Sequence, residues 1–229
     1  MTVTPSTQGG VDFAQGGARV TQPSPLIPTG APQRSLSVQI DELLHATPTL
    51  NPNAVYTVWI GANDILVNVS AAGSGLLTPA QVQANITTAA TDTLAQIARL
   101  RNAGAHRIMV FNLPDIGKTP LGLSTPSAPF SALSGLFNST LQAGLTSLNV
   151  DIIPINVFGL FNEIIANPAS FGLTNVTSTA CTVSSSLNCT LATLVAPNAD
   201  KTYAFADGVH PTPAGHQIIS DYAAAIIEA

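Results

Sequence analysis

Hydrophobic residues along this chain follow two alternating patterns. Short apolar runs lie at 55–60, 106–111 and 151–155, and each has the length of one strand in a buried sheet. Apolar residues spaced three or four apart predict helices at 35–45, 78–103, 129–148, around 161–165 and at 211–228. Strands that alternate with amphipathic helices predict an α/β fold with a parallel sheet covered on both faces.

The ends of the longest predicted helix carry the clearest signals. Thr78 is suited to the N-cap position, Pro79 to the first helical position, and Gly104 to a residue that ends the helix. By contrast, residues 1–35 and 168–204 are rich in turn-forming residues and are predicted to be loops, the first around a short element. No internal repeat or linker divides the chain, so a single domain over residues 1–229 is expected.

Composition narrows the class of protein. The 229 residues are 45% hydrophobic and only 8% charged, which is typical of a packed globular domain. The net charge is −5, and two Lys and five Arg are scattered without a basic stripe, so binding to nucleic acid is not expected. No apolar run reaches eighteen residues and the amino terminus lacks the pattern of a signal peptide. The chain as given is therefore expected neither to span a membrane nor to direct its own export.

The two cysteines, Cys181 and Cys189, are close enough in sequence to form a small loop disulfide or to remain two free thiols on a surface loop. We favour the disulfide, because the low Lys content and the abundance of Ser, Thr and Asn suit an exported protein. A disulfide would place the chain in an oxidising compartment. The four histidines do not cluster with cysteines or carboxylates at the spacing of zinc ligands, so no metal is expected.

Two polar patches carry candidate chemistry. In Asp207-Gly-Val-His210, the carboxylate can accept the Nδ1 proton of the ring and leave Nε2 free to act as a base, although such a segment is also common in solvated turns. Asn63 follows the apolar run 55–60 and can aim its amide at a substrate oxygen. Sites in doubly wound sheets lie beyond the carboxyl ends of the strands, so we expect the two patches to converge there.

These segments resemble the GDSL, or SGNH, family of esterases and lipases, in the branch found as passenger domains of bacterial autotransporters. The resemblance covers roughly residues 9–229. It is carried by Phe13-Ala-Gln-Gly16-Gly17-Ala, by Trp59-Ile-Gly-Ala-Asn63-Asp-Ile, and by Phe205-Ala-Asp207-Gly-Val-His210-Pro-Thr. It implies a three-layer, flavodoxin-like fold, hydrolysis of a lipid-like or other small carboxylic ester, no cofactor, and a secreted or cell-surface protein.

The resemblance also implies a role for each matched residue. His210 would be the base, and later the acid, while Asp207 orients its ring. Asn63 and Gly17 would form the oxyanion hole, with Gly16 as the alternative to Gly17 because the doublet leaves the register open.

One family element is missing from this sequence. No Gly-Asp-Ser-Leu segment occurs in it, and in the family that serine lies on the first strand. Ser6, Ser24 and Ser74 have sequence contexts that favour loops over a nucleophile. The first strand is thus expected to be missing or to be replaced by residues 1–4, by a strand from a second copy, or by a rearranged sheet. We favour a homodimer with exchanged elements.

Three functions are consistent with these residues. The first is a carboxylic-ester hydrolase that keeps the Asp207–His210 pair and the oxyanion hole, with activity reduced or rearranged by the missing serine. The second is a surface passenger that keeps the fold without catalysis. The third is a carbohydrate deacetylase of the same fold.

Overall fold

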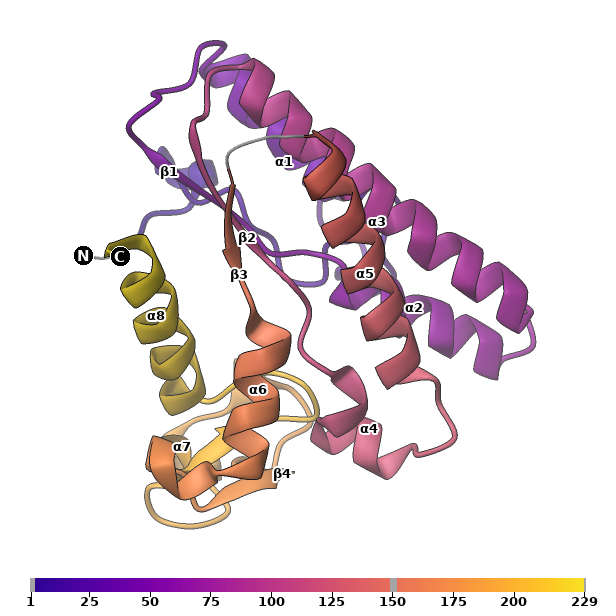
Figure 1. The fold of residues 1–229 in the computed structure, drawn as a ribbon. Coiled ribbons are helices and arrows are strands. Elements are labelled where there is room, and N and C mark those ends of the chain that lie inside the picture. Colours follow the sequence, from indigo (N-terminus) through magenta and orange to yellow (C-terminus); the bar gives the residue numbers. More distant parts are fainter. Residues whose placement is uncertain (1–2, 149–151, 229) are drawn as a thin grey trace. The chain divides into compact units, whose positions relative to one another are not determined.

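The computed structural model of this protein describes residues 3–148 and 152–228 (Figure 1). The chain forms two compact units, one made of residues 1–111 and 135–154 and the other of residues 112–134 and 155–229. Strands and helices alternate along the chain and two pairs of strands run parallel, so the predicted α/β class is confirmed.

The first unit is built on a sheet whose strands are β1 (Val55–Val58), β2 (Arg107–Phe111) and β3 (Ile152–Ile155), in the order β1-β2-β3, with the last residue of β3 counted in the second unit. All three were predicted from apolar runs, although Asp151, the predicted start of the third, lies outside the described residues. β1 and β2 are parallel, with Val55 opposite Arg107 and Val58 opposite Val110. In the described part of the chain β1 is an edge strand of this sheet.

Helices make up much of the rest of the first unit. They are α1 (Leu36–Ala46), α2 (Ala62–Gly73), α3 (Pro79–Asn102) and the part of α5 (Phe130–Leu148) that follows residue 135. Figure 1 shows α2 running alongside α3. At the start of α3, Gln81 N–H donates to Thr78 Oγ1 and Thr78 N–H donates to Gln81 Oε1, which confirms the predicted N-cap.

The turn between β1 and α2 depends on a glycine. Gly61 has a φ of +111°, a conformation that L side chains rarely adopt. A Cβ built there would lie 2.4 Å from Cζ of Phe137, which is fully buried. The aromatic ring therefore packs directly on the glycine that precedes α2.

The second unit contains the short helices α4 (Pro120–Ser124) and α7 (Ala199–Thr202), the longer α6 (Val157–Ala166) and α8 (Pro213–Glu228), and the parallel strands β4 (Asn175–Thr179) and β5 (Tyr203–Phe205). The rings of Phe161 and Phe205 pack with their centroids 5.9 Å apart inside this unit. The prediction that 168–204 is one long loop was wrong, because the polar sequence of β4 does not show the apolar run expected of a strand.

The remaining described segments are short turns and loops. The 3₁₀ turns are Ser6–Gln8, Ile116–Lys118, Pro168–Phe171, Ser186–Asn188 and Leu191–Thr193. Residues 3–35 form turns and loops, as predicted, but their short helical element is the turn Ser6–Gln8 and not the apolar segment 12–19 where the sequence placed it. Within residues 3–148 and 152–228, no helix has the length and apolar character needed to cross a lipid bilayer.

Candidate active site

The predicted pair of Asp207 and His210 is formed in the connection between β5 and α8. His210 Nδ1 lies 2.8 Å from Oδ2 and 2.9 Å from Oδ1 of Asp207. The backbone N–H groups of Val209 and His210 both donate to Oδ1. Asp207 is buried, whereas the His210 side chain is 62% exposed. The carboxylate is therefore held inside the unit while the ring reaches solvent.

Hydrogen bonds decide the charge states of this pair. Burial alone would raise the pKa of the Asp207 carboxyl, but hydrogen bonds from His210 and from the N–H groups of Val209, His210 and Ser186 outweigh it and hold that pKa far below 3.8. The hydrogen bond to Asp207, helped by its charge, raises the pKa of His210 above 6.5 despite partial burial. Asp207 is thus ionised at neutral pH and favours a proton on the ring, as the orienting partner of a base must.

A disulfide lies next to the pair. Cys181 and Cys189 are bonded, with their Cα atoms 5.8 Å apart, which confirms the predicted loop disulfide. Within that loop, Ser186 N–H donates to Asp207 Oδ2 over 2.6 Å. The sequence did not predict this contact, because a backbone donor leaves no signal in residue type.

The segment that carries the pair is also tied to the strand before it and the helix after it. Ala206 N–H donates to the carbonyl of His210 over 2.8 Å and closes the turn. The fully buried Thr212 donates from its hydroxyl to the carbonyl of Tyr203 and accepts from Gly215 N–H at the start of α8. The orientation of His210 is therefore fixed from both ends of its loop.

The second predicted patch, Asn63 with Gly17, is formed in the first unit. Asn63 lies in the first turn of α2, a helix that the sequence did not predict. Its Nδ2 donates to the carbonyl of Ala18 over 2.8 Å. Gly17 has a φ of +80°, and a Cβ there would approach the Leu26 carbonyl carbon to 3.1 Å. The amide of Asn63 and the segment after Gly17 are therefore brought together, and the second hydrogen of Nδ2 is not needed for this bond.

The next residue after Ala18 and the next residue after Asn63 form an ion pair, Arg19 with Asp64. Asp64, which is 2% exposed, accepts from Nε of Arg19 over 3.1 Å and from Val20 N–H over 3.1 Å. Burial raises the pKa of the Asp64 carboxyl above 3.8, although the charge of Arg19 and these hydrogen bonds oppose the rise. The start of α2 is thus bonded to the segment after Gly17 at two successive residues. Asn63 binds Ala18, and Asp64 binds Arg19 and Val20.

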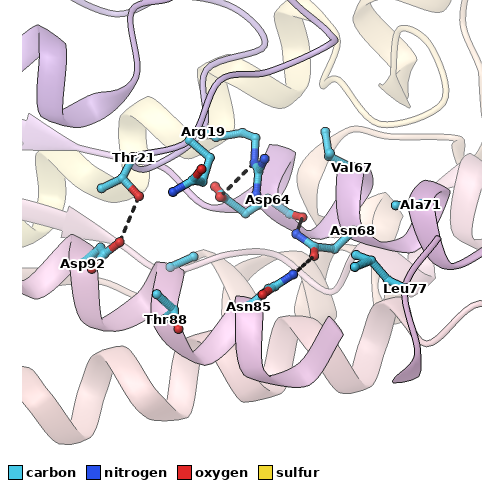
Figure 2. Close-up of a pocket in the computed structure, with 12 residues that line it drawn as sticks. Arg19, Thr21, Asp64, Val67, Asn68, Ala71, Leu77, Asn85, Thr88 and Asp92 are labelled. Carbon is cyan, nitrogen blue, oxygen red and sulfur yellow. Dashed lines mark hydrogen bonds and ion pairs between the residues drawn. The ribbon is translucent and has the colours of Figure 1, made fainter. Parts of the chain in front are cut away.

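A pocket of about 420 Å³ opens beside this ion pair. Figure 2 shows that its polar groups bind one another: Arg19 binds Asp64, Thr21 binds Asp92, and Asn85 binds Asn68. The apolar part of the pocket lining comes from Val67, Ala71 and Leu77. Because these polar side chains are already paired, the pocket is better explained as a structural network around Asp64 than as a ligand site.

The serines considered as substitutes for a nucleophile make local contacts. The hydroxyl of Ser6 accepts from Arg34, that of Ser24 accepts from Leu26 N–H, and that of Ser74 donates to the carbonyl of Ser70. Among the described residues, no group of three or more His, Cys, Asp or Glu side chains is arranged to hold a metal ion.

Residues 1–223 match the GDSL-like Lipase/Acylhydrolase family. The chain belongs to this family. An "Uncharacterized protein in trpE-trpG intergenic region" of Pseudomonas putida is 39% identical to it over 185 residues, which is 78% of this chain and 29% of that protein. Esterase EstA of Pseudomonas aeruginosa is 36% identical over 184 residues, covering 78% of this chain and 27% of that protein.

A more distant relative aligns with nearly the whole chain. Lipase 1 of Photorhabdus luminescens is 24% identical over 290 residues, which is 98% of this chain and 43% of that protein. The chain thus spans less than half the length of each of these three relatives. Asp207 with His210 and Asn63 with Gly17 lie in different compact units, so their convergence in one site stays a prediction.

Proposed function

We propose that this protein hydrolyses carboxylic esters, with His210 as the base and Asp207 as the group that orients it. The observation that carries the proposal is the carboxylate of Asp207, which is buried, ionised and hydrogen-bonded to Nδ1 of a solvent-exposed imidazole. Membership of a family with esterases and lipases supports the same chemistry. Asn63 Nδ2 and Gly17 N–H are the proposed donors to the oxyanion.

The hydroxyls of Ser6, Ser24 and Ser74 are held in local contacts, so the proposed nucleophile is water. His210 Nε2 takes a proton from water as its oxygen attacks the ester carbonyl carbon, and the carbonyl oxygen becomes an oxyanion that accepts from Asn63 and Gly17. Asp207 stabilises the imidazolium that forms. When the tetrahedral intermediate collapses, the bond to the alcohol breaks and the imidazolium returns its proton to the leaving oxygen, which yields a carboxylic acid and an alcohol.

Hydrolysis of p-nitrophenyl acetate tests this proposal. We expect turnover above the rate in buffer, and we expect His210→Ala to remove it while His106→Ala, at another exposed histidine, leaves it unchanged. Labelling with an alkyl fluorophosphonate separates water from serine as the nucleophile, because only an activated serine gives an adduct. No turnover above buffer with native secondary structure would refute the ester-hydrolase proposal and favour a non-catalytic passenger.

A second part of the proposal concerns assembly. We propose a homodimer in which a strand from one copy pairs with β1 of the other. β1 is an edge of the described three-stranded sheet, and Val55 on it is 39% exposed. Unpaired backbone groups on such an edge favour the addition of a strand. Size-exclusion chromatography with light scattering should give twice the mass of one chain, and a monomer across micromolar concentrations would refute the exchange.

We also propose that the protein acts in an oxidising compartment, as a secreted or surface-exposed domain of the autotransporter passenger type. The bonded Cys181 and Cys189 support this location, because such bonds rarely persist in the reducing cytosol. Fractionation of the producing cell, followed by thiol alkylation of the recovered protein, tests it. Protein recovered from the cytosol with both thiols free would refute the proposed location.

A further inference from the structure

The loop closed by Cys181 and Cys189 contacts Asp207 through one backbone group. Ser186 is the first residue of the 3₁₀ turn Ser186–Asn188, and the first N–H of such a turn has no partner within the turn. This N–H donates to Oδ2 of Asp207 over 2.6 Å. The same oxygen lies 2.8 Å from Nδ1 of His210. One carboxylate oxygen therefore joins the disulfide loop to the imidazole.

Two further ties fix the position of this loop. Cys181, which is 2% exposed, donates from its N–H to the carbonyl of Ala206, the residue before Asp207, over 3.1 Å. Thr182 N–H donates to the carbonyl of Thr193 over 2.9 Å, beyond the second cysteine. Three residues after Ser186, Cys189 is bonded to Cys181 by the disulfide. Ser186 is thus held between two ends that are both anchored beside Asp207.

The other carboxylate oxygen, Oδ1, also lies 2.9 Å from Nδ1 of His210, but its backbone donors are different. Oδ1 of Asp207 accepts from the N–H groups of Val209 and His210, which belong to its own turn. Those bonds exist whenever the turn is formed. The Ser186 bond is the one contact among these backbone donors that comes from a distant segment, so it fixes rotation of the carboxylate in a way that the turn alone does not.

We propose that the loop between Cys181 and Cys189 is a positioning element for the active-site pair, in which Ser186 N–H holds the Asp207 carboxylate toward His210 and the disulfide holds Ser186 in place. Ser186 is a positioning residue, because it acts through Asp207. The consequence of this arrangement for turnover rests on the proposed function. The effect of the loop on the pKa and orientation of Asp207 is independent of that function.

Ser186→Pro removes the N–H together with the hydroxyl. Proline is well tolerated at the first position of a helical turn, where its φ is suitable and the N–H is not used by the turn. Ser185 has φ −125° and ψ 129°, which is the conformation favoured before proline. Ser186→Ala is the matched control, since it removes the hydroxyl and keeps the N–H.

The first measurement is the pKa of Asp207, followed by carboxyl-carbon NMR. We expect Ser186→Pro to raise that pKa by about one unit relative to the unmodified protein, because a hydrogen bond to the charged form is lost. Ser186→Ala should leave it unchanged. Equal pKa values in the proline variant and the unmodified protein would overturn the proposal, and so would an equal rise in both variants.

The second measurement is amide hydrogen exchange at Ser186, and it needs no proline. In the disulfide-bonded protein we expect this amide to exchange at least about tenfold more slowly than an unstructured reference. In the variant Cys181→Ala/Cys189→Ala, the protection should be lost while that of Val209 is kept. Protection of Ser186 that survives in this variant would show that the disulfide does not hold the loop.

Turnover separates this proposal from the proposed function. If p-nitrophenyl acetate is hydrolysed, Ser186→Pro should lower kcat by about tenfold at unchanged KM, because geometry rather than binding is altered. An unchanged kcat together with a raised Asp207 pKa would overturn the catalytic role of the loop. If the unmodified protein has no turnover, the proposed function fails while the NMR and exchange results still decide the role of Ser186.

Discussion

The side-chain amide of Asn63 donates a 2.8 Å hydrogen bond to the carbonyl oxygen of Ala18. This bond orients Nδ2 and uses only one of its two hydrogens, and the other is the proposed donor to the oxyanion. We therefore expect Asn63→Ala to reduce kcat for p-nitrophenyl acetate by about 10²-fold with little change in KM, as for loss of one oxyanion donor. Asn85→Ala, which removes an amide that binds Asn68, is the control and should keep full turnover. Equal kcat values for the two variants would contradict a role of Asn63 in catalysis.

The Asp207–His210 pair predicts the pH dependence of hydrolysis. A base must be neutral, and the hydrogen bond to Asp207 raises the pKa of His210 above 6.5. The rate should therefore rise with pH through a midpoint above 6.5 and then level off. Asp207→Asn should move the midpoint to lower pH and reduce the plateau by about 10²- to 10⁴-fold, because the ring loses its anionic partner.

A profile of kcat against pH from 5 to 9 measures both effects. Asp221→Asn, at an exposed carboxylate on α8 that binds Gln217, should leave the profile in place. A midpoint that stays the same in Asp207→Asn would show that another group controls the rate.

The ion pair between Arg19 and Asp64 predicts that removing the arginine alone destabilises the fold more than removing both charges. Arg19→Met leaves a carboxylate that is 2% exposed without its cation, and we expect a loss of about 3–5 kcal/mol in the free energy of unfolding. Adding Asp64→Asn to that variant should restore much of the loss, because asparagine is neutral and still accepts from Val20 N–H.

Urea unfolding followed by circular dichroism gives the free energies of unfolding of the unmodified protein, of Arg19→Met and of the double variant. The matched control is Arg99→Met, which breaks a pair with Asp41 whose side chains are 37% and 62% exposed and should cost less than about 1 kcal/mol. A double variant no more stable than Arg19→Met would mean that packing of the arginine, and not its charge, stabilises this segment.

Gly61 predicts a steric effect at the start of α2. Gly61→Ala places a methyl group against the ring of Phe137 and forces alanine to a φ of +111°, so we expect a loss of about 2–4 kcal/mol. Gly73→Ala, at the last residue of α2 where a Cβ meets nothing within 4 Å, should be neutral or slightly stabilising. Thermal unfolding compares the two variants. If their melting temperatures are equal, the close packing on Gly61 does not contribute to stability.

Sequence patterns predicted the elements whose residues obey one simple periodicity. The helix that begins at Pro79 was predicted with its cap at Thr78, because its apolar face and its terminal residues agree. The helix Ala62–Gly73 was missed, because buried Asp64 and Asn68 interrupt its apolar face with polar side chains that only tertiary partners can satisfy.

In the candidate site, the contact between residues close in sequence was predicted, whereas contacts through backbone atoms or between distant residues were missed. Asp207 and His210 were predicted from a spacing that lets one turn join them, and the structure forms that contact. Ser186 and Ala18 take part through backbone atoms, which any residue type supplies. Arg19 was missed because the partner that gives it a role, Asp64, lies 45 positions later in the chain.

The stacked rings of Trp59 and Phe111 lie just past or at the carboxyl ends of β1 and β2, with centroids 5.4 Å apart. Trp59 is the single tryptophan of the sequence and is 40% exposed. Its fluorescence emission therefore reports on one position, two residues before Gly61, without any attached label. A ligand that covers this ring would shift the emission to shorter wavelength, which offers a direct way to screen compounds that bind at this edge of the sheet.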